Sequence, residues 1–382
     1  MKEKLSRTQH TGRDWLPAAL DFCLERTRHN LERLSSFPER IENEQWLCVD
    51  NGGWVGGHWV GLLWLAYAYS GEPVFQEAAE KWAARLAPRQ YDITTHDLGF
   101  LFELSHVLGF RLTDNQALKA PALQAAQTLA RRFNPAGRFL QAWGPLDAPA
   151  ELRGRTIVDT MMNLDLLFWA SQASGEVSLA QIAQAHAQTC LTYHVRPDYS
   201  TAHVADFDPH SGTFLKQDTH QGLSPTSCWS RGQSWTVYGF GDCYRATGET
   251  GFFEAAHGLA KYALQRLPPD HVPYWDYASP DIPEDVRDSS AAAILASGLL
   301  KLAQSESEAG LESEWHAAAQ AILASLWQNY SSRQTNVPSI LLHGTRSRPH
   351  GMQDHGLIYG DYYFMEGLLI LQGQPAILKA LI

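Results

Sequence analysis

The sequence lacks the features that mark several classes of protein. No apolar run reaches the ~20 residues that a membrane-spanning helix needs. Residues 1–14 are polar and charged and contain no apolar core of a signal peptide, so we expect a cytoplasmic protein with a flexible tail over residues 1–12. The chain is therefore expected to have no membrane partner.

Cysteine and clustered positive charge are also scarce. The 382 residues include 5 cysteines and no CxxC pair, which argues against a disulfide framework and against a zinc site. The net charge is −11, and basic runs are short. Because binding to phosphates requires clustered Lys and Arg, a nucleic-acid partner is not expected. An anionic ligand would need a local pocket of buried Arg and His.

Aromatic residues, by contrast, are abundant. They make up 11% of the chain, and the chain has 13 Trp. Aromatic rings present flat apolar faces to the C–H side of sugar rings, while their N–H and O–H groups bond hydroxyls. A large helical core also needs bulky side chains, so composition alone leaves both explanations open.

The hydrophobic pattern has helical periodicity from end to end. Apolar segments such as GLLWLAYAY and GQSWTVYGF alternate with amphipathic ones such as FQEAAEKWAARL. Helices that are apolar all round lie inside those with a polar face. The sequence predicts twelve helices, over residues 14–31, 57–69, 74–86, 97–110, 117–133, 159–173, 179–194, 232–246, 252–267, 288–303, 311–329 and 361–371.

The connections between these helices differ on the two sides of the expected ring. Short turns such as Ser70-Gly71-Glu72 follow the apolar helices, and Gly suits a left-handed position there. Six such hairpins predict an all-α fold, a closed (α/α)6 barrel of one domain over residues 1–382. Longer connections are often functional and lead into the inner helices, which places the expected site on that face. They span residues 87–96, 134–158, 196–230, 268–287 and 330–360.

Polar clusters open the inner helices, and four of these clusters contain an Asp. Asp97 and Asp159 each begin an apolar helix and are the candidate pair. Two carboxylates facing each other across a cavity are the usual machinery of glycosidic chemistry. Asp is also favoured at helix N-caps, so capping is the alternative role for each one taken singly. A cap does not need neighbours such as His96 and Arg231.

Several strings in a fixed order carry a family resemblance. They are THDLGF, IVDTMMNLDLLFWAS, THQGLSPTSCWSRGQSWTVYGF, YWDY, RDSSAAAI and GDYYFMEGLL. From about residue 53 to the C-terminus, the chain resembles the unsaturated glucuronyl hydrolases of glycoside hydrolase family 88. The resemblance implies removal of a 4,5-unsaturated uronic acid from the non-reducing end of lyase-generated oligosaccharides, including glycosaminoglycan-type disaccharides. An Asp would protonate C4, water would add at C5 and the hemiketal would open, without a metal or organic cofactor.

The resemblance also implies roles for particular residues. Asp159 matches the general acid/base, and Asp97 matches a second essential aspartate that would hold sugar hydroxyls and tune Asp159. For Arg231, a forked cation suited to a uronate carboxylate, the alternative is a structural ion pair with an Asp at the mouth. Asp288 and Asp361 are expected to be caps or network residues. The expected substrate-binding residues are His203, Gln221, Arg231, Trp235, Trp54, Trp143 and His96, with core packing as the alternative for Trp54 and Trp143.

Other functions remain open from the sequence. One is an unsaturated rhamnogalacturonyl hydrolase of pectin breakdown, although His96-Asp97 and the string SRGQSW favour the glucuronyl family. A second is a sugar epimerase on the same barrel, which would leave Asp159 without a role, and a third is a non-catalytic glycan-binding protein. The expected partner is an unsaturated uronate-terminated oligosaccharide, and the expected state is a monomer or dimer.

Overall fold

A computed structural model describes residues 14–308 and 313–382 of the chain. The tail predicted over residues 1–12 lies outside the described residues, as does the beginning of the helix predicted over residues 311–329. No helix within the described ranges is both long and apolar enough to cross a membrane.

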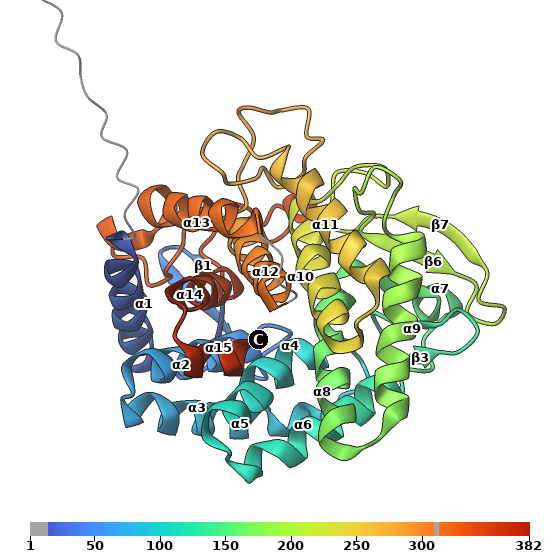
Figure 1. Ribbon diagram of the computed structural model, residues 1–382, viewed down its shortest axis with the longest axis horizontal. Coiled ribbons are helices and arrows are strands. Elements are labelled where there is room, and N and C mark those ends of the chain that lie inside the picture. Colours follow the sequence, from blue (N-terminus) through green and yellow to red (C-terminus); the bar gives the residue numbers. More distant parts are fainter. Residues whose placement is uncertain (1–13, 309–312) are drawn as a thin grey trace, which may run out of the picture.

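The described helices form two concentric rings (Figure 1). In the inner ring each segment packs against the next, and α14 packs against α2 to close the circle. This arrangement confirms the predicted (α/α)6 barrel. The inner segments are α2 (Gly56–Ser70), α4 (Leu98–Phe102) continuing through η2 (Glu103–Val107) into α5 (Leu108–Thr113), η3 (Val158–Asn163) with α8 (Leu164–Ser174), α10 (Ser230–Thr247), α12 (Ser289–Glu308) and α14 (Ile358–Gln372).

The outer helices cover the inner ring with one apolar face each. In α3, the residues Phe75, Ala79, Trp82 and Leu86 are buried at helical spacing, whereas α2 is buried along most of its length. The outer helices are α1 (Trp15–Leu31), α3 (Pro73–Leu86), α6 (Gln116–Ala130), α9 (Val177–Tyr193), α11 (Thr250–Leu264) and α13 (Trp315–Ser325), which continues into η4 (Leu326–Tyr330).

Glycines make the inner-to-outer turns and one close helix contact possible. The predicted turn residues Gly71, Gly175, Gly248 and Gly373 have φ angles of 70°, 79°, 72° and 78°, the left-handed conformation expected at a helix C-terminus. At Gly57, a Cβ atom would lie 1.9 Å from the carbonyl oxygen of Phe100. Only glycine therefore allows α2 to approach the next inner helix so closely.

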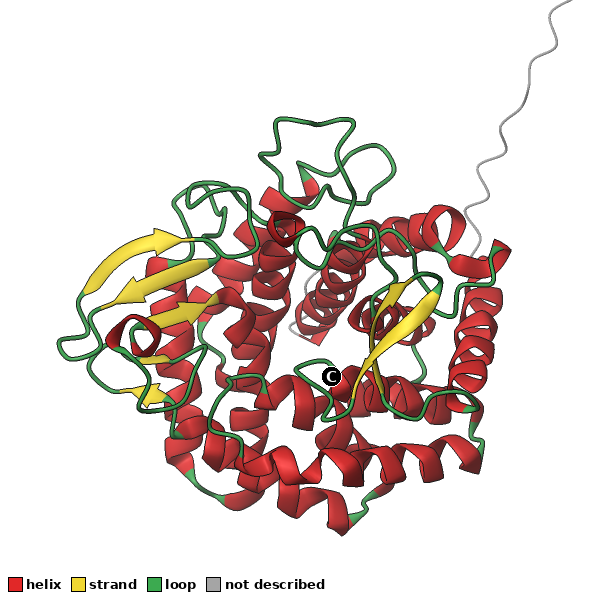
Figure 2. Cartoon of the chain, turned by 180° about the vertical axis from the view of Figure 1, so that it is seen from behind, coloured by secondary structure: helices red, strands yellow, loops and turns green. Residues whose placement is uncertain are grey.

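The predictions missed the short strands between the helices (Figure 2). They form three antiparallel sheets; β1–β2, β3–β4 and β6–β7 are local pairs, whereas β5 pairs with β6 across some 50 positions of sequence. The strands have two to six residues each, too few for a clear period-2 pattern. The strands are β1 (Phe37–Glu42), β2 (Gln45–Val49), β3 (Phe133–Asn134), β4 (Phe139–Leu140), β5 (Arg155–Ile157), β6 (Val204–Phe207) and β7 (Phe214–Asp218).

Short helical segments were also missed, and some predicted helices end earlier than expected. The helix predicted over residues 117–133 ends at Ala130, and that predicted over residues 252–267 ends at Leu264. The additional segments are η1 (Ala87–Tyr91), α7 (Ala150–Arg153), η5 (Ser332–Gln334), η6 (Arg348–His350) and α15 (Pro375–Leu381).

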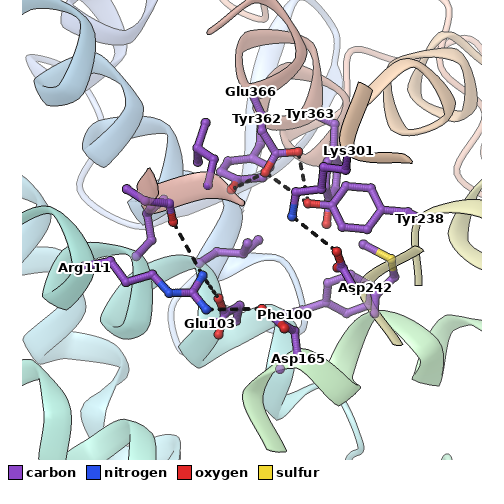
Figure 3. Close-up of a pocket in the computed structure, with 16 residues that line it drawn as sticks. Phe100, Glu103, Arg111, Asp165, Tyr238, Asp242, Lys301, Tyr362, Tyr363 and Glu366 are labelled. Atoms are coloured by element: carbon purple, nitrogen blue, oxygen red, sulfur yellow. Dashed lines mark hydrogen bonds and ion pairs between the residues drawn. The ribbon is translucent and has the colours of Figure 1, made fainter. Parts of the chain in front are cut away.

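A network of charged side chains lies inside the ring, around an enclosed cavity of about 30 Å³ (Figure 3). Arg111 Nη1 lies 3.0 Å from Glu103 Oε1, and Lys301 Nζ lies 3.6 Å from Asp242 Oδ1. Burial raises the pKa of Glu103 to about 8, and Glu103 shares a hydrogen bond with Asp165. The acidic side chains of the network pair with its basic side chains. We therefore interpret the network as part of the core and not as a ligand site.

This raised pKa predicts a pH-dependent stability. Between its ordinary pKa and about 8, Glu103 is protonated in the folded chain and ionised in the unfolded chain. The free energy of unfolding should therefore decrease as pH rises through this window, by up to about 1.4 kcal/mol per pH unit from this residue. Urea unfolding at a series of pH values measures the slope. The variant Glu103→Gln should flatten it, whereas Glu25→Gln on the exposed surface of α1 should not; equal slopes in all three proteins would contradict the prediction.

Candidate active site

A cavity of about 340 Å³ opens on the face where the inner helices begin. Its walls combine two aspartates, two arginines and aromatic rings drawn from segments that are far apart in the sequence. Of the predicted residues, Trp54, His96, Asp97, Trp143, Asp159, Gln221 and Arg231 line it; the remaining lining residues are Ile157, His220, Arg346, Ser347, His350 and Met352.

Asp97 begins α4, but its carboxylate makes no capping hydrogen bond to that helix. Instead, Thr95 Oγ1 donates to Asp97 Oδ2 at 2.6 Å, and His96 Nε2 lies 3.3 Å from Asp97 Oδ1. The other ring nitrogen of His96 lies 2.7 Å from the hydroxyl of Thr160. Both oxygens of Asp97 therefore have a polar neighbour.

Asp159 lies in η3 and has a different environment. Its Oδ2 atom is buried and lies 3.5 Å from Nε2 of His203, while the side chain also reaches the cavity. Burial raises the pKa of Asp159, and the neighbouring His203, His96 and Arg231 lower it; the net pKa lies below its ordinary value. The pair thus consists of two carboxylates with unlike neighbours, as acid/base assignments require.

Arg231 begins α10 and is buried together with Asp288. Its Nη1 atom donates to Asp288 Oδ2 at 2.8 Å and to the carbonyl oxygen of Thr345, and Nη2 donates to the carbonyl oxygen of Arg346 at 2.6 Å. Three of its five N–H donors are used in this way, and Nε has no partner among the described residues. The structural ion pair is present, yet Arg231 keeps donors that face no other group.

Two of the predicted site residues, Gln221 and Arg231, position the loop that carries Arg346 through hydrogen bonds. Gln221 Nε2 donates to the carbonyl oxygen of Arg346 at 2.8 Å, which adds to the bond from Arg231. The side chain of Arg346 is paired with Glu39 at 2.6 Å. Gln221 therefore helps to position the cavity wall in addition to lining it.

Aromatic rings occupy two positions in the wall. Trp54 packs against Tyr359 with ring centroids 5.0 Å apart, and Trp143 lies 5.2 Å from His220. Both tryptophans remain partly exposed, so each has a ring surface available to a ligand. Trp235, in contrast, is fully buried under the cavity between Phe100 and Tyr363. The structure thus brings Trp54 and Trp143 into the cavity and leaves Trp235 below it.

The other two mouth aspartates serve the framework. Asp288 Oδ1 accepts the backbone N–H and the hydroxyl of Ser290 at the start of α12, as a helix cap does. Asp361 accepts the backbone N–H groups of Ile340 and Leu341 at 2.9 and 2.8 Å. These placements agree with the expectation that both residues are caps or network residues.

Sequence reasoning missed the loop residues of the wall: His220, Arg346, Ser347, His350 and Met352. The lengths of connections 196–230 and 330–360 identified their segments. Nothing in those segments, however, indicates which side chains turn inward, because a loop has no periodicity to read. Within residues 14–308 and 313–382, no group of three His, Cys, Asp or Glu side chains could hold a metal ion.

Comparisons with known proteins match this architecture. The chain is 35% identical to an unsaturated glucuronyl hydrolase from Bacillus sp. strain GL1, covering 93% of this chain and 96% of that protein. It is 34% identical to an unsaturated chondroitin disaccharide hydrolase from Streptococcus pyogenes serotype M1, covering 96% and 94% of the two chains. No family model matches the sequence.

Solved structures agree. The crystal structure of the unsaturated glucuronyl hydrolase from Bacillus sp. GL1 superposes with a TM-score of 0.89 at 34% identity, covering 94% of this chain and 97% of that one. An unsaturated glucuronyl hydrolase specific for heparin superposes with the same score at 29% identity, again covering 94% and 97%. The barrel and its carboxylate-bearing cavity thus belong to a glycoside hydrolase. Within that class, the chain belongs to the family of unsaturated glucuronyl hydrolases, which confirms the resemblance seen in its motifs.

The buried ion pair at the mouth predicts a large stability effect. In the variant Asp288→Asn, Oδ1 can still accept the cap hydrogen bonds, but Arg231 loses its negative partner inside the protein. We expect the free energy of unfolding to fall by about 3–5 kcal/mol, because a buried charge is left uncompensated. Thermal or urea unfolding measures the change. Glu32→Gln in the exposed pair with Arg33 is the control and should change stability by less than ~1 kcal/mol; a similar small effect of Asp288→Asn would contradict the prediction.

Proposed function

We propose that the chain removes a 4,5-unsaturated uronic acid from the non-reducing end of short anionic saccharides, with Asp159 as general acid and base. The observation that carries the proposal is the unlike environment of Asp97 and Asp159 on one cavity wall. A carboxylate with polar neighbours at both oxygens suits binding, and one with a single histidine neighbour suits proton transfer. Family membership supports the same reaction.

The reaction is an addition followed by ring opening. Asp159 donates its proton to C4 of the C4–C5 double bond, which leaves positive charge at C5 and the ring oxygen. A water molecule adds at C5 and returns a proton to the Asp159 carboxylate, so the catalyst is restored. The resulting hemiketal opens, and a keto-uronic acid separates from the shortened saccharide. Asp97, which lines the same cavity, holds sugar hydroxyls.

Charge and aromatic surface support an anionic sugar as the substrate. Arg231 and Arg346 line the cavity, and their guanidinium groups suit a uronate carboxylate, although the whole chain is acidic. Trp54 and Trp143 offer ring faces to the sugar. Among the relatives, three streptococcal proteins are chondroitin disaccharide hydrolases, and one crystal structure from Streptococcus agalactiae holds dGlcA-GalNAc6S. We propose glycosaminoglycan-type disaccharides as the substrate class.

Three further proposals concern the chain as a whole. One large hydrophobic cluster extends from Leu16 to Leu381, which supports a single domain, and a single cooperative unfolding transition would test it. A cytoplasmic location is proposed, and cell fractionation would test it. The oligomeric state is proposed as monomer or dimer and is measured by light scattering.

The first test of the activity uses lyase-generated unsaturated disaccharides from chondroitin, hyaluronan, heparin and pectin. The wild-type protein should remove the low-ultraviolet absorbance of the conjugated double bond for at least one of them. Asp159→Asn should lower kcat by at least about 10²-fold, because the amide cannot deliver the proton. The matched control is Asp361→Asn assayed for folding and activity, since Asp361 bonds only the framework. Consumption of no unsaturated disaccharide by the wild-type protein would refute the proposal.

The pKa of Asp159 predicts the pH dependence. The acid must be protonated when it donates, and its pKa in the empty site lies below its ordinary value. The protonated fraction of free protein therefore decreases as pH rises from about 5 to 8, and kcat/KM should fall, approaching tenfold per pH unit. A bound uronate places a negative charge nearby and raises this pKa, so kcat should decline only at higher pH. Initial rates across this range provide the measurement, and a kcat/KM that rises with pH would contradict the assignment.

A further inference from the structure

His203 is held in an unusual set of contacts directly behind Asp159. The residue is buried and does not line the cavity. Its Nδ1 atom accepts two backbone hydrogen bonds, from the N–H groups of His220 and Gln221, each at 3.1 Å. Its Nε2 atom faces Asp159 Oδ2 at 3.5 Å, and neither of these two atoms has another hydrogen-bond partner in the described part of the chain.

These contacts determine where the proton of the imidazole lies. Backbone N–H groups only donate, so Nδ1 must act as an acceptor and cannot carry a hydrogen. The neutral ring then has its hydrogen on Nε2, pointing at Asp159. A second proton on Nδ1 would face two N–H donors and would break both bonds in a buried position, which costs free energy for each unsatisfied group. The contacts of Nδ1 therefore select the Nε2–H tautomer of the neutral ring.

This tautomer matters because an imidazole is ordinarily a stronger base than a carboxylate. A histidine with a free lone pair beside the acid would take the proton that C4 needs. In the observed arrangement, both ring nitrogens of His203 are occupied, so it cannot accept the proton of Asp159.

We infer that His203 is a positioning residue, locked as the neutral Nε2–H tautomer, that donates to Oδ2 of Asp159 and thereby directs the acid proton to Oδ1. The inference rests on the proposed function and extends it. Oδ2 is buried, so Oδ1 is the oxygen that can reach a sugar in the cavity. A proton on Oδ2 would face the Nε2–H group and would be useless for transfer. The 3.5 Å between Nε2 of His203 and Oδ2 of Asp159 is long for a hydrogen bond, so the inference requires the two atoms to move closer when substrate binds. Such shortening is common, because hydrogen bonds in empty active sites are often long.

Other charged and titratable groups surround the pair. His96 comes from the segment before α4, Arg231 from α10, and His194 from the end of α9, while His220 lies beside His203 on its own connection. Burial lowers the pKa of His96 and lowers that of His194 to about 4, so both are neutral at pH 7. Arg231 is the fixed positive charge near Asp159, and it is present in every variant described below.

Two substitutions separate the two contacts of the ring. In His203→Gln, the side-chain amide N–H reaches the position of Nε2 and keeps a donor for Asp159, but the acceptor for the two backbone groups is lost. In His203→Asn, the side-chain oxygen takes the position of Nδ1 and keeps the backbone bonds, but the donor for Asp159 is lost. Steady-state rates as a function of pH should be measured for both variants and for the wild-type protein.

We expect His203→Gln to retain kcat within about tenfold with an unchanged pH profile. His203→Asn should lose on the order of 10²-fold in kcat, because the acid proton is no longer directed. Its alkaline limb should also move to higher pH, because the ionised Asp159 loses a hydrogen-bond donor. The reverse ranking, equal losses with unmoved profiles, or full activity in both variants would each overturn the inference.

A second measurement needs no activity, and it needs only one folded variant for the assignment. Nitrogen NMR of wild-type protein labelled at histidine, with His203 assigned by its loss in whichever of His203→Gln and His203→Asn folds, reports which ring nitrogen carries the hydrogen. In the neutral ring the hydrogen should lie on Nε2, and Nδ1 should give the signal of an acceptor. A hydrogen on Nδ1 of the neutral ring would overturn the inference even if the hydrolase activity is confirmed. Conversely, absence of hydrolase activity would refute the proposed function while this spectrum still tests the tautomer.

Discussion

The packing of α14 against α2 closes the ring, and the candidate site depends on this closure. Its residues stand at the beginnings of different inner segments, from Trp54 before α2 to Arg231 at the start of α10. In an open row of hairpins they would be spread along an edge. Because the row closes on itself, all of these beginnings face a common axis, and residues separated by hundreds of positions share one cavity of about 340 Å³.

Closure also concentrates charge at two levels of the ring. Away from the mouth, Glu103 pairs with Arg111 and Asp242 pairs with Lys301 around a small cavity. At the mouth, Arg231 is paired with Asp288 and also lines the larger cavity. The first arrangement compensates its charges. The second places a cation in the wall of the candidate site, although the chain has a net charge of −11.

The two site aspartates show how neighbours decide the role of identical side chains. Asp97 has polar neighbours at both oxygens, whereas Asp159 has His203 near one oxygen and reaches the cavity with its side chain. Neighbours from distant segments therefore give two aspartates at similar positions in the sequence pattern different surroundings.

Much of this could be read from the residues before the structure. Alternating apolar and amphipathic helices, with glycine turns such as Gly71, predicted the barrel, because periodicity and turn conformation are local properties. The motifs that contain Asp97, Asp159 and Arg231 are also local in sequence, and they predicted that these residues lie at one cavity. The strands from β1 to β7 escaped prediction, since each has only two to six residues and the pairing of β5 with β6 joins distant segments.

The roles of individual side chains required the tertiary structure. Trp235 has the same aromatic character as Trp54, yet it lies beneath the cavity, and His203 lies behind the acid rather than beside the sugar. Sequence alone determined the helical pattern, the family motifs and the face that bears the site. Only the tertiary structure decided which atoms meet there, because burial, hydrogen-bond partners and the protonation of a ring depend on neighbours from distant segments.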